Sequence, residues 1–375
     1  MSSKRIRKKH SSDWSNCPLC GRPLPLDHRR RVIGSTGRAI CTSCLRSAEC
    51  VKGLCVTKKP PAVDKPFLYD PKAVLKQLDE RIIGQDVAKR AVVMALWKQT
   101  LRARGDELPG ASLLLYGPTG CGKTALLREA TQIMGLPFLA ADATSISETG
   151  YRGKDAVEIV KDLVKSCGSV EKAAYGVIFI DEFDKLAATP DNEYRGAYCR
   201  GTQFSLLKLI EGLDVETDEG KINTEHILFL FGGAFSRLTG RRRAKAVHKS
   251  VGFLREEEPE ICEDYPRVLL PEDFVAYGME PELMGRVGRC VGLDTLTEEH
   301  LRKILLESKL SVYQRYQQYF RKKGKNLAMS EVEIEELVHK AYQRGMGARG
   351  LNALVEEWME PKLTALAEET YGQVG

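Results

Sequence analysis

The sequence predicts an α/β fold built around a parallel sheet, with a small helical domain after it and a small cysteine-rich module before it. Three observations predict this order. Residues 67–295 alternate short apolar runs of strand type with helical patterns, which is typical of a parallel sheet covered by helices on both faces. From residue 296 to 375 only helical patterns follow. Residues 1–55 contain two Cys-x-x-Cys pairs, with too few apolar residues between them to build a core.

The composition is that of a globular protein whose positive charge is concentrated at one end. Its 375 residues are enough for two or three domains, and 43% of them are hydrophobic and 29% charged. Residues 1–60 contain 14 Lys and Arg against 3 Asp and Glu, whereas the rest of the chain is mildly acidic. No apolar run is long enough to span a membrane, and the basic start lacks the apolar stretch of a secretory signal. We therefore expect a cytoplasmic protein without a membrane segment.

Two cysteine pairs with the spacing of a zinc site lie near the start of the chain. Each pair, Cys17-Pro-Leu-Cys20 and Cys41-Thr-Ser-Cys44, has two intervening residues, and twenty residues separate the pairs. Turns of this kind hold two thiolates at the spacing that a zinc tetrahedron needs. Because four thiolates fill the coordination shell, we expect a structural Zn²⁺ site formed by Cys17, Cys20, Cys41 and Cys44.

Other interpretations of this module stay open. Cys50 and Cys55 follow closely and could replace a ligand, and the pairs could instead be redox-active or plain surface thiols. The basic residues of the module, among them Arg29-Arg30-Arg31, suit either nucleic acid or protein partners. Residues 56–66, which are rich in Pro and Lys, predict an extended linker to the rest of the chain.

A phosphate-binding loop lies between a predicted strand and a predicted helix. The apolar run Ala111–Tyr116 leads directly into Gly117-Pro-Thr-Gly-Cys-Gly-Lys-Thr124, and a helical pattern starts at Ala125. Backbone amides at the helix start can face phosphate, Lys123 would bridge the β- and γ-phosphates, and the Thr124 hydroxyl would ligate Mg²⁺. The residues expected to contact ATP here are Gly117, Pro118, Thr119, Gly120, Cys121, Gly122, Lys123, Thr124 and Ala125.

Two carboxylates after a second buried strand complete the predicted nucleotide site. The apolar run Gly176–Ile180 ends in Asp181 and Glu182, and Asp181 lies 57 residues beyond Thr124. Asp181 would hold Mg²⁺ directly or through water, and Glu182 would polarise a water for attack on the γ-phosphate. Carboxylates after a strand are also common in surface turns, but behind a phosphate loop they indicate ATP hydrolysis. A third strand is predicted at His226–Phe231.

The region after residue 296 has the start signals of several helices. Leu301–Leu306 follows an acidic first turn, and Ser330-Glu-Val-Glu333 has the spacing of a capping box. A helix that ends near Gly345 is expected to be followed by one that begins near Leu351. This pattern predicts a small helical domain that can rotate against the α/β domain.

Together these features resemble the ClpX family of AAA+ ATPases, and the resemblance covers most of the chain. Besides the cysteine module and the phosphate loop, the motifs that carry it are Leu78-Asp-Glu-Arg-Ile-Ile-Gly-Gln85, Ile180-Asp-Glu-Phe-Asp-Lys185, Leu206-Leu-Lys-Leu-Ile-Glu-Gly212, Phe231-Gly-Gly-Ala-Phe235 and Gly347-Ala-Arg-Gly-Leu351. The resemblance implies a ring, usually a hexamer, with ATP held between a large α/β domain and a small helical one. It also implies an ATP-dependent unfoldase that threads unfolded or tagged proteins into a ClpP-type peptidase.

The resemblance further assigns roles to single residues. Ile83, in the adenine-side motif, would contact the nucleotide. Arg286 would be the arginine finger that reaches a neighbour's γ-phosphate, and Arg349 would sense the nucleotide in its own subunit. Tyr151, in a glycine-flanked segment, is similar to the pore loop that grips the translocating polypeptide. Without the resemblance, either arginine could be in a surface salt bridge and Tyr151 in an ordinary turn.

Two further segments concern substrates and partners. Val251-Gly252-Phe253 resembles the family's exposed tripeptide for docking on ClpP, and a short apolar segment in a polar stretch needs a partner or a pocket. Residues 213–220 are acidic and lead into a short connection where the family has a basic loop at the pore entrance. This difference leaves the substrate preference open.

The sequence thus predicts a zinc-containing, homo-oligomeric unfoldase that uses ATP and Mg²⁺, with domains at residues 1–55, 67–295 and 296–375. No nucleophile, base and orienting residue can be assigned for peptidase activity. One alternative is a nucleic-acid-directed AAA+ ATPase, although we expect the basic module to recruit proteins rather than nucleic acid. The others are a remodelling chaperone that acts without a peptidase and a scaffold that binds ATP without hydrolysing it.

Overall fold

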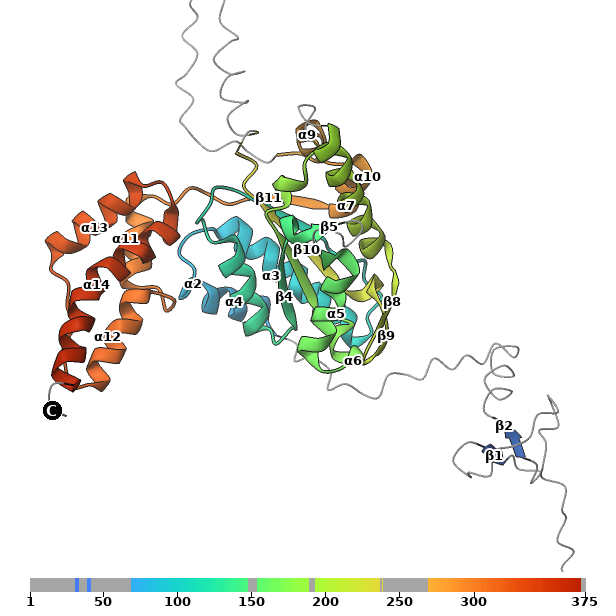
Figure 1. Cartoon of the computed structure of the whole chain (residues 1–375), viewed down its shortest axis with the longest axis horizontal. Helices are drawn as coiled ribbons and strands as arrows, with labels where there is room; N and C mark the ends of the chain where they lie inside the picture. Colours follow the sequence, from blue (N-terminus) through green and yellow to red (C-terminus); the bar gives the residue numbers. More distant parts are fainter. Residues whose placement is uncertain are drawn as a thin grey trace, which may run out of the picture. The chain divides into compact units, whose positions relative to one another are not determined.

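The computed structural model describes residues 69–147, 154–188, 193–236, 238 and 269–371, and the backbone of two short strands nearer the start of the chain (Figure 1). The chain divides into two compact units, residues 1–64 and residues 65–375. In the first unit, β1 (Arg31–Ile33) pairs antiparallel with β2 (Ala39–Cys41).

Several predicted functional residues lie outside the part of the chain that the structure describes. They are three of the zinc ligands, Cys17, Cys20 and Cys44, the pore-loop residue Tyr151, and the docking tripeptide Val251-Gly252-Phe253. The fourth zinc ligand, Cys41, is described by its backbone alone, at the end of β2. The predicted linker at residues 56–66 also lies outside the described ranges.

A five-stranded parallel sheet forms the centre of the second unit, as the alternating pattern predicts. Its strand order is β11-β3-β10-β7-β4, and every neighbouring pair is parallel. The strands are β3 (Leu113–Tyr116), β4 (Phe138–Asp142), β7 (Val177–Asp181), β10 (Leu228–Gly233) and β11 (Arg289–Gly292). The carboxyl ends of all five strands therefore lie at one edge, where open α/β sheets bind ligands.

Helices cover both faces of this sheet (Figure 1). Along β3, Leu113 and Leu115 belong to one buried core, and Leu114 and Tyr116 belong to the other, as the two-residue period of a strand requires. The first core is closed by α2 (Pro71–Asp79), α3 (Asp86–Arg104) and α4 (Lys123–Ile133). The second is closed by α5 (Ala156–Cys167), α7 (Glu193–Glu211), α9 (Pro271–Tyr277) and α10 (Pro281–Val287).

Short elements fill the connections between these layers. The segment predicted only as an acidic connection forms a hairpin, in which β8 (Asp214–Thr217) pairs antiparallel with β9 (Gly220–Asn223) and Val215 and Ile222 are buried. The other elements are β5 (Ile146–Ser147), which pairs in parallel with β6 (Lys154–Asp155), α6 (Val170–Ala173), and 3-10 helices at Ala143–Ser145, Phe183–Leu186 and Thr224–His226.

Helices with a core of their own form the end of the described chain, namely α11 (Glu298–Leu306), α12 (Val312–Lys322), α13 (Glu331–Gln343) and α14 (Gly347–Tyr371). The predicted capping box starts α13, since the Ser330 N–H donates to Glu333 Oε2 at 2.8 Å and the Glu333 N–H donates to Ser330 Oγ at 3.3 Å. The predicted start of α14 near Leu351 was wrong, since the helix begins at Gly347, next to the Ala348 N–H that donates to the Gly120 carbonyl oxygen. Within the described ranges, no helix has both the length and the apolar character needed to cross a membrane.

Candidate active site

The phosphate loop connects the end of β3 to the start of α4 and has the backbone that its glycines predict. Gly120 and Gly122 have φ angles of +79° and +104°, in the left-handed region that other residues rarely adopt. A Cβ atom on Gly120 would lie 2.0 Å from the main-chain oxygen of Met346, so no larger residue fits there. The loop ends at the N-terminus of α4, a position where helix amides bind phosphate.

Hydrogen bonds bring the loop side chains to the predicted carboxylate. Lys123 is buried, and its Nζ donates to the carbonyl oxygens of Gly117 at 2.8 Å and Pro118 at 3.1 Å. The Thr124 hydroxyl donates to Asp181 Oδ2 at 2.7 Å. Lys123, Thr124 and Asp181, which lie on α4 and β7, therefore meet at the carboxyl edge of the sheet.

The oxygen atoms of Thr124 and Asp181 form a suitable pair of ligands for Mg²⁺. Hydroxyl and carboxylate oxygens are hard donors, which this cation prefers in proteins. Because the two oxygens are already 2.7 Å apart, both side chains can contribute to one site without rearrangement of the sheet. The residues present thus fit the predicted cation.

Glu182 follows β7 in a strained backbone conformation. Its φ of +54° is uncommon for a residue with a side chain, and its N–H donates to Asp181 Oδ1 at 2.9 Å. Its carboxylate is exposed, so water can reach it. The arrangement offers a carboxylate base next to the predicted cation ligands.

Cys121 lies inside the loop and is shielded from solvent. Only 3% of the residue is exposed, and its Sγ lies 3.9 Å from Lys123 Nζ. Burial raises the pKa of the Cys121 thiol, and the neighbouring ammonium of Lys123 opposes this only in part. The thiol is therefore in its protonated, poorly nucleophilic form near neutral pH.

The small helical domain contacts the loop through the start of α14. The Ala348 N–H donates to the Gly120 carbonyl oxygen at 3.1 Å. Arg349 follows directly, in the first turn of α14, and its side chain is exposed. Arg349 is therefore the residue directly after a main-chain hydrogen bond to the phosphate loop.

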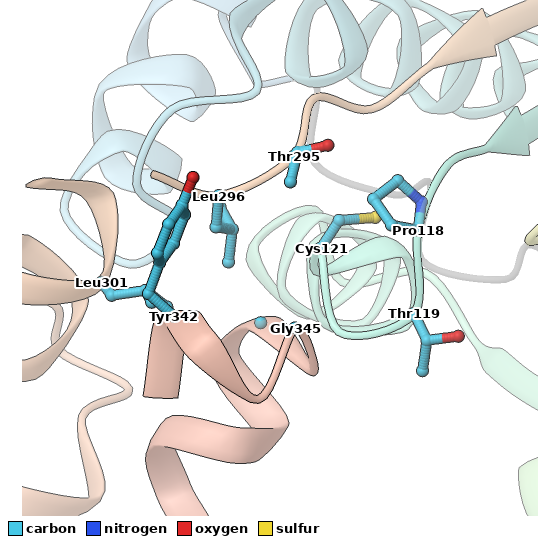
Figure 2. Close-up of a pocket in the computed structure, with 9 residues that line it drawn as sticks. Pro118, Thr119, Cys121, Thr295, Leu296, Leu301, Tyr342 and Gly345 are labelled. Carbon is cyan, nitrogen blue, oxygen red and sulfur yellow. The ribbon is translucent and has the colours of Figure 1, made fainter. Parts of the chain in front are cut away.

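A pocket of about 50 Å³ lies between the loop and the small domain, with Pro118 and Cys121 on one side and Leu301 and Tyr342 on the other (Figure 2). Its other lining residues are Thr119, Thr295, Leu296, Gly345 and Gly347. The pocket is small and mostly apolar, and it shows that the phosphate loop and the small domain meet around a shared cavity. Ile83, which the sequence predicts to contact the nucleotide, is not among the described residues that line this pocket. Its half-buried side chain belongs to the connection between α2 and α3.

Arg286 lies away from this pocket, on α10. Its guanidinium donates to Glu211 Oε1 at 2.8 Å, and the side chains are 58% and 43% exposed. Exposed ion pairs of this kind are worth about 0–1 kcal/mol, so the contact can be exchanged readily for another. Among the described residues, Arg286 is paired with Glu211 and does not line the pocket, and its role as an arginine finger stays a prediction.

Sequence reasoning missed two buried polar residues around the site. The side chain of Gln85, in the predicted adenine-side motif, bonds the main chain of Asp294 instead of a nearby helix amide. Asp184 is 7% exposed, and its Oδ1 accepts from the Ala234 N–H at 3.1 Å, which ties the turn after β7 to the end of β10. A signal for Asp184 was available in the sequence, because this acid follows the apolar Phe183 shortly after a buried strand, and a carboxylate drawn into a core needs a partner.

Comparison with known proteins identifies the family. Residues 108–290 match the AAA domain (Cdc48 subfamily), and residues 296–370 match the C-terminal, D2-small domain of ClpB protein. The ATP-dependent Clp protease ATP-binding subunit ClpX of Treponema denticola is 34% identical over 368 residues, which are 92% of this chain and 88% of that protein. The chain belongs to the ClpX family. Its relatives also include ClpX of Azotobacter vinelandii, 32% identical over 92% of this chain and 84% of that protein, and ClpX 3 of Methylococcus capsulatus, 31% identical over 91% and 86%.

Membership of the ClpX family makes the chain an AAA ATPase that uses ATP and Mg²⁺. The predicted AAA+ domain with a parallel sheet and the helical domain that follows it are confirmed. The roles of individual residues stay predictions, and so do the zinc site and the peptidase partner.

Proposed function

We propose that this chain hydrolyses ATP where Thr124 meets Asp181 and uses the free energy to unfold proteins. The observation that carries the proposal is the 2.7 Å hydrogen bond between these two side chains, because it joins the phosphate loop to the strand that precedes Glu182. The names of the relatives, which are ATP-binding subunits of an ATP-dependent Clp protease, support the process that hydrolysis would drive.

Each side chain at the site has a task that its position supports. Lys123 would exchange the carbonyl oxygens of Gly117 and Pro118 for β- and γ-phosphate oxygens. Mg²⁺, held by Thr124 and Asp181, would neutralise charge on the phosphates. Glu182 would orient the attacking water and accept its proton, which its exposed carboxylate allows.

The two arginines would make hydrolysis depend on assembly and on domain position. Arg286 would leave Glu211 and contact ATP bound by a neighbouring subunit, which requires a homo-oligomer, and we propose a hexamer. Arg349 would contact nucleotide in its own chain, because Ala348 beside it already bonds the phosphate loop.

We further infer how hydrolysis would be coupled to unfolding in a cytoplasmic complex. Tyr151 would grip unfolded or tagged proteins, and Val251-Gly252-Phe253 would dock on a ClpP-type peptidase. Zn²⁺ would fold residues 1–55, and residues 56–66 would tether this module to a large domain at 67–295 and a small domain at 296–375. The resemblance of the sequence to the ClpX family supports these assignments.

Hydrolysis is tested with Glu182→Gln in steady-state ATPase and ADP-binding measurements on the full chain. We expect the rate to fall by about 10²–10⁴-fold while ADP still binds, because only the base is lost. Glu158→Gln, a change of another exposed glutamate in the same domain, serves as the control. An unchanged rate in Glu182→Gln would remove this residue from the mechanism.

Unfolding is tested with a stable, tagged protein, with and without a ClpP-type peptidase. Tyr151→Ala should slow unfolding while Tyr151→Phe retains it, since an aromatic surface is what grips the chain. Equal unfolding by Tyr151→Ala and the wild type would refute the pore role. ATP turnover that is stimulated by DNA and falls steeply with salt would instead favour the nucleic-acid-directed alternative.

A further inference from the structure

Gln85 has an unusual backbone conformation directly before α3. Its φ of +62° lies in the left-handed region, where residues other than Gly, Asn and Asp are seldom found. The residue is only 6% exposed, and its side chain does not cap α3, although this is the capping position. Such a conformation persists where surrounding contacts impose it, and functional sites are enriched in these cases.

The side-chain amide of Gln85 clamps a residue that lies 209 positions further along the chain. Its Nε2 donates to the Asp294 carbonyl oxygen at 2.9 Å, and its Oε1 accepts from the Asp294 N–H at 2.8 Å. Asp294 lies between β11 and α11, in the linker from the α/β domain to the small helical domain. Two opposed hydrogen bonds fix both the distance and the orientation of this linker peptide.

The same amide also reaches the phosphate loop. Gln85 Nε2 lies 3.4 Å from the Cys121 carbonyl oxygen, a longer hydrogen bond than the two to Asp294. The preceding carbonyl of the loop, that of Gly120, accepts from Ala348 at the start of α14. The Gly120 carbonyl is therefore bonded to the small domain, and the next carbonyl, that of Cys121, is bonded to the side chain that holds the linker.

We propose that Gln85 is a positioning residue that transmits the state of the phosphate loop to the linker at Asp294. The inference rests on the proposed nucleotide site. The Cys121 carbonyl shares one rigid peptide plane with the N–H of Gly122, a loop amide expected to face phosphate. When that N–H turns toward a bound phosphate, the Cys121 carbonyl turns with it. The change alters the bond to Gln85 and thereby the hold on Asp294.

Gln85→Asn tests this role with a small change. Asn tolerates the left-handed backbone conformation, but it is one methylene shorter, so its amide cannot bond Asp294 and approach Cys121 together. The matched control is Gln99→Asn. Gln99 is 1% exposed and donates to the carbonyl oxygens of Tyr175 at 3.1 Å and His226 at 2.7 Å, at the amino ends of β7 and β10. It offers the same chemistry at the opposite edge of the sheet.

The measurement is hydrogen exchange of the full chain, with and without ADP and Mg²⁺, followed on the peptide that contains the Asp294 amide. In the wild type and Gln99→Asn, ADP should change this exchange rate by about fivefold or more, the usual lower range of coupling between two sites. In Gln85→Asn, exchange should be faster without ADP and should respond to ADP by less than about twofold. Gln85→Gly, which suits the backbone conformation and lacks the side chain, should behave in the same way.

The outcomes separate the proposal from a merely structural role and from the nucleotide site itself. Equal responses to ADP in Gln85→Asn and the wild type would overturn the role of Gln85. A loss of response in both Gln85→Asn and Gln99→Asn would also overturn it, because general loosening of the domain would then explain the effect. ADP binding is measured in parallel with Lys123→Ala. If that variant binds ADP as the wild type does, the proposed nucleotide site fails instead.

Discussion

Gly347→Ala should detach the small helical domain from the phosphate loop. Gly347 has a φ of +55°, and a Cβ atom on it would lie 2.7 Å from the Gly120 carbonyl oxygen, against the 3.4 Å at which ordinary contact begins. The obstacle is main chain and cannot rotate away. The start of α14 must therefore retreat by about 0.7 Å, and the 3.1 Å hydrogen bond from Ala348 to Gly120 stretches beyond useful length.

The size of the effect follows from two contributions. A left-handed conformation costs an alanine about 1–2 kcal/mol, and a lost main-chain hydrogen bond costs about 0.5–1.5 kcal/mol. Arg349 moves with the start of α14, and a displacement of about 1 Å at a reacting group can lower a rate by about 10²-fold. We therefore expect Gly347→Ala to lose about 2–3 kcal/mol of stability and at least about tenfold in ATP turnover.

Gly324→Ala separates the contact from the backbone strain. Gly324 has a similar φ of +73° in the same domain, but nothing lies within 4 Å of an added Cβ atom. It should lose about 1–2 kcal/mol and retain its ATP turnover. Thermal unfolding and steady-state ATPase assays on both variants provide the comparison. If turnover in Gly347→Ala equals that in Gly324→Ala, the contact with the loop does not serve catalysis.

Three further predictions concern charge and protonation. Arg286→Ala should reduce ATP turnover by about 10³-fold or more in the assembled protein. Glu211→Gln, which removes only the ion-pair partner, should keep ATP turnover within about twofold of the wild-type rate. ATPase assays at matched oligomeric state test both expectations. The Cys121 thiol should react slowly with maleimide at pH 7.5 until the chain is unfolded, as mass spectrometry can follow. Because burial raises the pKa of this thiol in the folded chain above its ordinary value of 9.0, the stability that the protonated thiol contributes is lost as the pH rises above 9.0. Hydrogen bonds from the Ser330 N–H, at the cap of α13, and from the Trp358 indole lower the pKa of Glu333 from 4.5 to about 2. The stability that the ionised Glu333 carboxylate contributes is therefore present above pH 4.5 and is lost as the pH falls toward 2. Glu333→Gln should remove that titration from the fluorescence of Trp358.

The sheet and the phosphate site could be predicted because their signals are local. The strand, glycine-rich loop and helix can be recognised from consecutive residues, and so can a buried strand that ends in acids. Recognising either motif needs no knowledge of the rest of the chain. Even so, the third strand begins at Leu228 rather than at His226. His226 closes a short 3-10 helix and stacks on Tyr175 with ring centroids 5.2 Å apart, and neither feature follows from apolar periodicity.

The contacts between segments that lie far apart in the chain could not be predicted. Gln85 and Asp294 are 209 positions apart, and nothing in either segment indicates which buried amide meets which carbonyl. The start of α14 also lies beside a distant segment, because the Ala348 N–H in its first turn donates to the Gly120 carbonyl oxygen. The pairing of Arg286 with Glu211 depends on how α10 packs on α7, which periodicity leaves undefined.

The left-handed backbone at Glu182 has a consequence for any attempt to make this protein more heat-resistant. A screen that selects only for survival at high temperature would favour Gly or Asn at position 182, because each adopts a φ of +54° with less strain than glutamate. The variants selected in this way would lack the Glu182 carboxylate, which we propose as the catalytic base. Natural selection and a thermal screen would then choose opposite residues at this position, as is common where activity requires a locally unfavourable conformation.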